Sequence, residues 1–152
     1  MKKIVVLGVL LLTGYLLQAQ SNTPFVLSLN HVALSVTDVN RSALFYGQTL
    51  KLQEITNRTQ LEGIRWFSLG DGKELHLIST LKEKVTINKA VHLALTTPGF
   101  AAFLQMLQVK QIPYSDWPGT PNKVNVRADG IQQVFFQDPD GYWIEVNSVA
   151  GH

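Results

Sequence analysis

The chain has 152 residues, of which 13 are basic, 11 are acidic and none is cysteine. A chain without cysteine cannot use disulfide bonds, thiolate metal ligands or a cysteine nucleophile. Its basic residues are neither clustered nor interleaved with aromatic ones, which argues against nucleic-acid binding.

Residues 1–20 have the features of a secretory signal peptide. Lys2 and Lys3 precede an apolar run over 4–17, and small residues near Ala19 provide a cleavage site. The run is short for a membrane span, so we expect cleavage and export to the periplasm or the medium, with no membrane attachment afterwards. An uncleaved anchor is the alternative. Removal of Lys2 and Lys3 lowers the 13 basic residues to 11, which equals the 11 acidic ones.

The chain from residue 25 to residue 80 predicts a strand, a helix and three further strands. Residues 25–36 alternate between apolar and polar side chains, as a strand does. Apolar residues then recur at helical spacing over 39–50, after Asp38 or Asn40 as a helix cap. Short strands are expected over 52–58, over 63–69 and around His76.

A charged linker over 81–89 leads to a second region with the same order of elements. Its first strand contains His92, and Thr97 with Pro98 predicts the start of the second helix. A long loop over 114–129 and a last strand within 137–148 complete the chain. Helices alternate with strands that can pair in antiparallel fashion, and this order indicates an α+β fold.

Two stretches of sequence occur twice, which indicates an internal repeat. Residues 69–78 align with 138–147 at a constant offset of 69, so that His76 falls on Glu145. Residues 30–36 align with 91–97 at an offset of 61, so that His31 falls on His92. The chain therefore consists of two copies of one structural unit.

The four residues His31, His76, His92 and Glu145 lie mid-strand at equivalent places of the two units. Three imidazoles and one carboxylate related by a pseudo-twofold axis suit one divalent metal ion, with zinc, nickel, iron and manganese not distinguished. Glu74 lies on the same face as His76 and competes with it as a ligand.

Four segments resemble the vicinal oxygen chelate superfamily, which includes glyoxalase I, bleomycin resistance proteins and extradiol dioxygenases; they read NHVALSVTDVNRSALFY, GIRWFSLGDGKELHLI, VHLAL and FFQDPDGYWIEV. The resemblance implies one domain over 25–149, built from two βαβββ modules at about 25–80 and 89–149. These modules form a cupped mixed sheet with a metal in the cup. The implied ligands are His31, His76, His92 and Glu145, in one chain or across a homodimer that exchanges modules. Sequences resembling glyoxalase I usually have Glu where this chain has His76.

Three functions are compatible with this resemblance. The first is a metal-dependent lyase or isomerase acting on a small molecule whose oxygens chelate the metal, with Glu145 as the base. The second is an Fe(II) extradiol-type dioxygenase that uses His31, His92 and Glu145. The third is a non-catalytic binding or resistance protein. Candidate substrate contacts, each with core packing as the alternative role, are Arg65, Trp66, Trp117, Arg127 and Tyr142.

Overall fold

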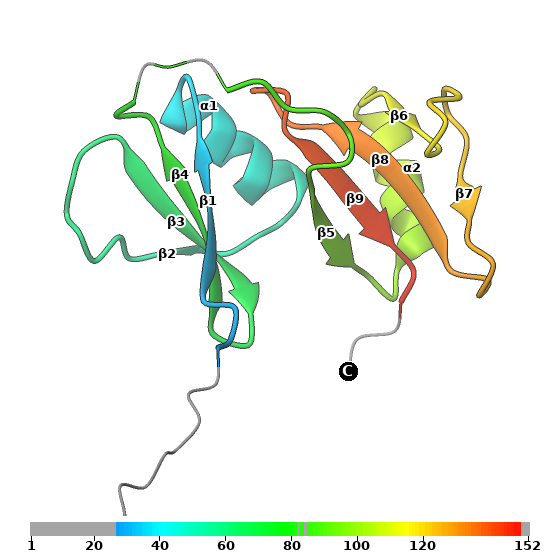
Figure 1. Ribbon diagram of the computed structural model, residues 1–152, viewed down its shortest axis with the longest axis horizontal. Coiled ribbons are helices and arrows are strands. Elements are labelled where there is room, and N and C mark those ends of the chain that lie inside the picture. Colours follow the sequence, from blue (N-terminus) through cyan, green and yellow to red (C-terminus); the bar gives the residue numbers. More distant parts are fainter. Residues whose placement is uncertain (1–26, 82, 84, 150–152) are drawn as a thin grey trace, which may run out of the picture.

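The computed structural model of the chain describes residues 27–81, 83 and 85–149 (Figure 1). The predicted signal peptide over 1–20 lies outside the described residues, as does the terminal His152. Within the described part of the chain, no helix has the length and apolar character needed to cross a membrane.

Two units of the predicted order are present, and together they confirm the α+β fold. The first unit has the strands and helices β1 (His31–Ser35), α1 (Val39–Leu44), its π-helical continuation η1 (Phe45–Thr49), β2 (Glu54–Ile55), β3 (Ile64–Gly70) and β4 (Lys73–Ile78). The second unit has β5 (His92–Thr96), α2 (Phe100–Val109), β6 (Tyr114–Ser115), β7 (Asn125–Val126), β8 (Gln132–Gln137) and β9 (Trp143–Asn147). The predicted long loop therefore contains β6 and β7.

The two sheets have the same strand order. It is β1-β4-β3-β2 in the first unit and β5-β9-β8-β6 in the second, where β7 also pairs with β8. In each unit the first and last strands are parallel neighbours, β1 with β4 and β5 with β9, while the other pairs are antiparallel. This pairing places His31 and His76 on neighbouring strands, and it does the same for His92 and Glu145.

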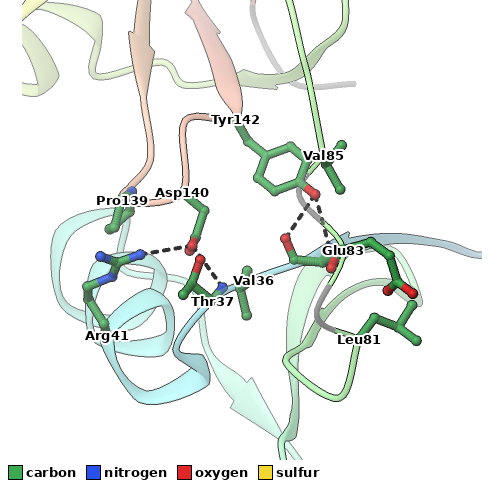
Figure 2. A pocket seen from close by; sticks show the side chains of 10 residues that line it. Val36, Thr37, Arg41, Leu81, Glu83, Val85, Pro139, Asp140 and Tyr142 are labelled. Carbon is green, nitrogen blue, oxygen red and sulfur yellow. Dashed lines mark hydrogen bonds and ion pairs between the residues drawn. The ribbon is translucent and has the colours of Figure 1, made fainter.

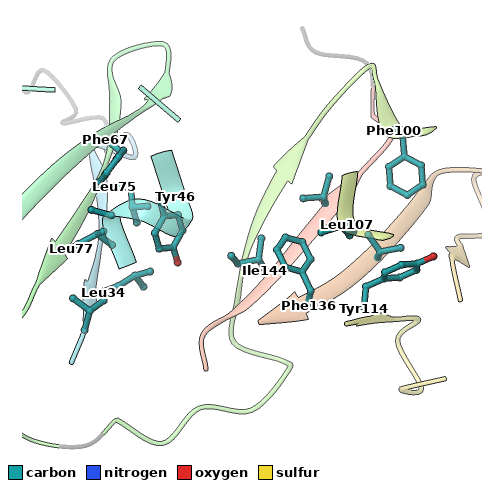
Figure 3. Close-up of a cluster of buried hydrophobic side chains, with 14 residues drawn as sticks. Leu34, Tyr46, Phe67, Leu75, Leu77, Phe100, Leu107, Tyr114, Phe136 and Ile144 are labelled. Atoms are coloured by element: carbon teal, nitrogen blue, oxygen red, sulfur yellow. The ribbon is translucent and has the colours of Figure 1, made fainter. Parts of the chain in front are cut away.

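One hydrophobic core joins the two units (Figure 3). Alternation along the strands gives each sheet one apolar face, which supplies Leu34, Phe67, Leu75 and Leu77 in the first and Val134, Phe136, Ile144 and Val146 in the second. The Phe136 ring lies 6.4 Å from that of Phe45 and 5.8 Å from that of Phe103, measured between centroids. Phe45 of η1 therefore packs against the apolar face of the second sheet, beside Phe103 of α2. Consequently, the opposite, polar faces of the sheets lie on the outer sides of the core.

The turn between β8 and β9 fastens the second unit to the first (Figure 2). The Asp140 carboxylate accepts hydrogen bonds from Thr37 N–H, from Arg41 Nη2 and, at 2.6 Å, from Ser42 Oγ. Buried Asp138 accepts the Tyr46 hydroxyl at 2.8 Å. The Tyr142 hydroxyl accepts the N–H of Ser35 and donates to its carbonyl, which covers the backbone of edge strand β1.

We call the turn residues Asp138, Asp140 and Tyr142, together with their partners Ser35, Thr37, Arg41, Ser42 and Tyr46, the polar clamp. Opposing effects act on its two carboxyl groups. Burial raises the pKa of Asp138. Burial also acts to raise the pKa of Asp140, but the hydrogen bonds from Ser42 and Thr37 outweigh it and hold that pKa below its ordinary value. The pKa values of the two carboxyl groups are therefore shifted in opposite directions, that of Asp138 upward and that of Asp140 downward.

Candidate functional site

The polar face of the first sheet presents a stack of rings. The ring of His76 on β4 lies 4.3 Å from that of His31 on β1 and 4.0 Å from that of Trp66 on β3, measured between centroids. The planes are nearly parallel, at 12° and 5°. Because β1 and β3 flank β4, His76 lies between the two other rings. Trp66 Nε1 is buried and has no hydrogen-bond partner among the described residues.

Glu74 determines which nitrogen of His76 is free. Its carboxylate oxygens lie 2.8 Å from His76 Nε2 and 2.7 Å from Arg58 Nη2, and the Arg58 guanidinium lies over the Trp66 ring. The hydrogen bonds from His76 and Arg58 hold the pKa of Glu74 below its ordinary value. A carboxylate can only accept, so His76 Nε2 donates, and Nδ1 is the ring nitrogen that Glu74 does not engage.

The polar face of the second sheet brings His92 and Glu145 together. His92 Nδ1 lies 2.9 Å from the carbonyl oxygen of Lys89, and His92 Nε2 lies 3.3 Å from a carboxylate oxygen of Glu145. The other oxygen of Glu145 accepts a hydrogen bond from Asn147 Nδ2 at 2.9 Å. Since the carbonyl can only accept, Nδ1 donates to it, and Nε2 is the nitrogen that faces the Glu145 carboxylate. Two acceptors at this distance require a proton or a cation between them.

Aromatic side chains surround this second pair. His92 makes edge contacts with Phe135 and Trp117, at centroid distances of 5.6 Å and 6.3 Å. Lys89 Nζ lies 4.6 Å from the centroid of the Trp143 ring and donates to Ser115 Oγ and to the carbonyls of residues 116 and 117. Lys89 thus holds the long loop beside His92. Sequence reasoning placed Lys89 in the linker, and its position three residues before His92 was the one available signal.

The two pairs remain separate within one chain. Among residues 27–81, 83 and 85–149, no three His, Asp or Glu side chains are grouped closely enough to hold a metal ion. The pairs lie on the outward polar faces of two sheets whose apolar faces share one core. The donor types fit a divalent metal, but one chain provides two half-sites rather than a closed site.

The predicted substrate contacts fall into two groups. Trp66 and Trp117 lie beside His76 and His92, at the candidate site. Arg65 points to the opposite face of β3 from Trp66 and forms two hydrogen bonds with Glu54, at 2.7 and 2.6 Å. The other two make contacts away from the candidate site. Arg127 forms an ion pair with Asp129, and the Tyr142 hydroxyl donates to the carbonyl of Ser35 on β1.

Comparisons with known proteins relate this architecture to one superfamily. A family model described as Glyoxalase/Bleomycin resistance protein/Dioxygenase superfamily matches residues 28–146. Glyoxylase I 4 of Arabidopsis thaliana is 30% identical over 127 residues, which make up 78% of this chain and 69% of that protein. A solved glyoxalase/dioxygenase from Nostoc punctiforme is 26% identical, with a TM-score of 0.62 over 94% of this chain and 97% of that one. Oxidase ChaP-H2 shares the fold, with 19% identity and a TM-score of 0.65 over 83% and 96% of the respective chains.

Proposed function

Because the chain belongs to the glyoxalase/bleomycin resistance protein/dioxygenase superfamily, we propose that it is a metal-dependent enzyme with glyoxalase-like lyase or isomerase chemistry on a small molecule. His31, His76, His92 and Glu145 would hold one divalent ion. The observation that carries the proposal is the 3.3 Å contact between His92 Nε2 and the Glu145 carboxylate, two groups that a cation would satisfy together. Both belong to side chains that divalent transition metals accept as ligands.

We further propose that the site closes between two copies of the chain. The two half-sites face outward from a shared core, so a second chain can bring its first polar face against the second polar face of its partner. A twofold axis would then produce two identical sites per dimer. The outward direction of the half-sites supports a homodimer over a site within one chain.

The chain's own residues would perform the proton transfer. Glu145 would take a proton from a substrate carbon next to a carbonyl, and the hydrogen bond from Asn147 Nδ2 to its carboxylate supports a fixed orientation of this base. Phe135 and Trp117 form an apolar wall beside His92 that would limit access of water. A bound divalent ion supplies Lewis-acid polarisation of the substrate oxygens.

A dioxygenase or related oxygen enzyme is the second candidate, and the state of His76 favours it. Glu74 binds Nε2 of His76, the ring is stacked between two others, and the side chain is 11% exposed, against 22% for His92. His31, His92 and Glu145 alone would form the two-histidine, one-carboxylate set that non-haem Fe(II) enzymes use.

Elemental analysis of the protein as purified, without added metal, tests both proposals. We expect about one divalent ion per chain, with zinc, nickel or manganese supporting the lyase and iron with oxygen uptake supporting the oxygen enzyme. His92→Ala should remove the ion. Protein that holds no ion after growth in metal-supplemented medium would contradict both candidates and leave a non-catalytic binder.

The substitution Glu145→Gln tests the base. The amide keeps one oxygen ligand but cannot take a proton, so turnover on α-oxoaldehydes, epoxides or catechols, whichever responds, should fall about 100-fold or more. Glu62→Gln alters an exposed carboxylate of the same type and is the matched control. Unchanged turnover in Glu145→Gln would rule out this residue as the base.

We also propose export of the protein, on the sequence of residues 1–20. The product isolated from its native host should begin near Gln20 or Ser21 and be found outside the cytoplasm. N-terminal sequencing of the purified product is the measurement, and a cytoplasmic protein that starts at Met1 would contradict export.

A further inference from the structure

The polar clamp joins the β8–β9 turn to the first unit. The internal repeat relates it to a second junction, between the β3–β4 turn and the second unit, which has no such hydrogen bonds among the described residues. The internal offsets relate the turn at Asp140 to the turn at Asp71, and the junction of β1 and α1 to the junction of β5 and α2. Asp140 is bound by three partners, whereas the side chain of Asp71 is 92% exposed. The two units are therefore fastened on one side only.

The sequence explains this asymmetry position by position. Thr37 gives Asp140 a backbone N–H, but its equivalent is Pro98, which has none. Four other residues of the clamp are replaced by apolar side chains that form no hydrogen bond, with Phe103 for Ser42, Ala102 for Arg41, Leu69 for Asp138 and Leu107 for Tyr46. Lys73 replaces Tyr142, and its ammonium group can donate to a carbonyl but cannot accept a backbone N–H. The second junction is therefore an apolar version of the clamp.

A cavity of about 440 Å³ lies at this second junction. Its wall combines residues of both units, including Leu50, Leu52, Leu69, Leu95, Phe103 and Val146. Small-molecule sites are typically of about 300–1,000 Å³ and mostly apolar, and this cavity meets both criteria.

The polar residues of the cavity define the chemistry of its occupant. Among the described residues that line it, Lys73 is the one charged residue, and Thr96 and Thr97 are the polar ones. Lys73 Nζ lies 3.9 Å from the exposed Asp71 carboxylate, a contact too loose and too solvated to neutralise it. An apolar wall with one ammonium group matches an amphiphile that has a single alkyl chain and an anionic head.

We propose that this cavity binds a medium-chain fatty acid or a similar single-chain carboxylate, with the alkyl chain between the two units and the carboxylate at Lys73. This site is separate from the half-sites of His31 and His92, because none of the four half-site residues is among the described residues that line the cavity. The proposal therefore does not rest on the metal or on the proposed activity.

Calorimetric titration of the full chain with octanoate, decanoate and dodecanoate tests the proposal. We expect one molecule bound per chain and an affinity that rises about fourfold for each further methylene buried. Dodecanol lacks the charge and should bind about fivefold more weakly than dodecanoate. Binding of many molecules per chain, or no dependence on chain length, would show adsorption to the surface and overturn the proposal.

Two variants locate the binding. Leu52→Trp fills the cavity and should abolish binding, once circular dichroism shows that the variant is folded. Lys73→Glu is a surface change that does not threaten folding, and it should weaken dodecanoate binding at least fivefold while leaving dodecanol unaffected. Lys110→Glu, an exposed charge reversal beyond α2, is the matched control. Dodecanoate binding that survives both cavity variants would show that the fatty acid binds elsewhere. If the parent chain binds no fatty acid and Leu52→Trp loses dimers, the cavity belongs to a contact between chains and the proposal is wrong.

Discussion

Glu74 shows how one residue sets the chemistry of its neighbour. It lies two residues before His76 on the same face of β4, and its carboxylate binds both His76 Nε2 and Arg58. Alternation along the strand predicted that Glu74 would lie near His76. The sequence pattern did not predict which of the two would point toward a metal, because this depends on Arg58 and Trp66, which come from other segments.

The hydrogen bond between Glu74 and His76 has a spectroscopic signature. In metal-free protein, the Nε2 proton of His76 should be protected from exchange and should give a downfield proton resonance, because it is bound to a carboxylate. Glu74→Ala should remove this resonance. Arg58→Ala is the control, since it breaks the contact with Arg58 and leaves the bond to His76 in place. A resonance that persists in Glu74→Ala would mean that His76 is held by another group.

Among the elements, the strands and helices with clear periodicity were the most predictable. The helix at 39–50 and the strands of His76 and Glu145 occur where the sequence predicts them, and Asp38 caps the first helix. The first strand is shorter than predicted, because residues 27–30 are not strand, and His31 and His92 are the first residues of β1 and β5 rather than mid-strand residues. The second helix begins at Phe100 after Gly99, later than Thr97 and Pro98 suggested, and Thr97 Oγ1 accepts the N–H of Gly99. Strands β2, β6 and β7 have two residues each, too few to show alternation.

The polar clamp was predictable as a turn but not as a contact between units. Asp138, Pro139, Asp140 and Gly141 form the predicted turn, with Gly141 at a φ of +90°. The partners of Asp140 lie 98 to 103 residues earlier in the chain. No local pattern carries information about a contact of that separation.

Asp140 makes the clamp sensitive to acid. Its pKa in the folded protein lies below the ordinary value of 3.8, so its contribution to stability is present above that pH. The contribution is lost as the pH falls through the lower folded pKa. Asp140→Asn should therefore lower the free energy of unfolding by about 1–2 kcal/mol at pH 7, and this difference from the parent should shrink below pH 4.

Urea unfolding at pH 7, 4 and 3 measures this effect. Asp71→Asn is the matched control, because Asp71 occupies the equivalent turn and is 92% exposed. Burial, the largest cause of the raised pKa of Asp138, is the same in all three proteins, but the Asp140 charge also raises that pKa, so Asp140→Asn relieves part of the shift and Asp71→Asn does not. A loss of stability that is equal at all pH values would assign the role of Asp140 to turn geometry rather than to charge.

For the whole molecule, the repeat in the sequence predicted the two units and the four site residues at equivalent positions, while the strand order within each unit came from the structure. Strand alternation also placed each of the four on the polar face of its sheet. The relative direction of the two faces was not predictable, because it depends on the contacts of Phe45 and Phe103 with Phe136 in the shared core. That direction decides whether one chain or two are needed for a complete site.

A mixing experiment distinguishes a site across a dimer from a site within one chain. One variant carries His31→Ala and His76→Ala, which removes the first half-site, and the other carries His92→Ala and Glu145→Ala, which removes the second. Neither should bind metal alone. In a mixed dimer, the intact second half-site of the first variant meets the intact first half-site of the second variant, so one of the two sites is restored.

Mixed dimers purified through two different affinity tags should therefore hold about half of the wild-type metal content per chain. Elemental analysis of this preparation is the measurement, with each variant refolded alone as the baseline. A site within one chain would leave every chain in the mixture with only half of its ligands, and no metal would be recovered. Recovery of metal in the mixed dimer alone thus requires that the outward half-sites of two chains meet.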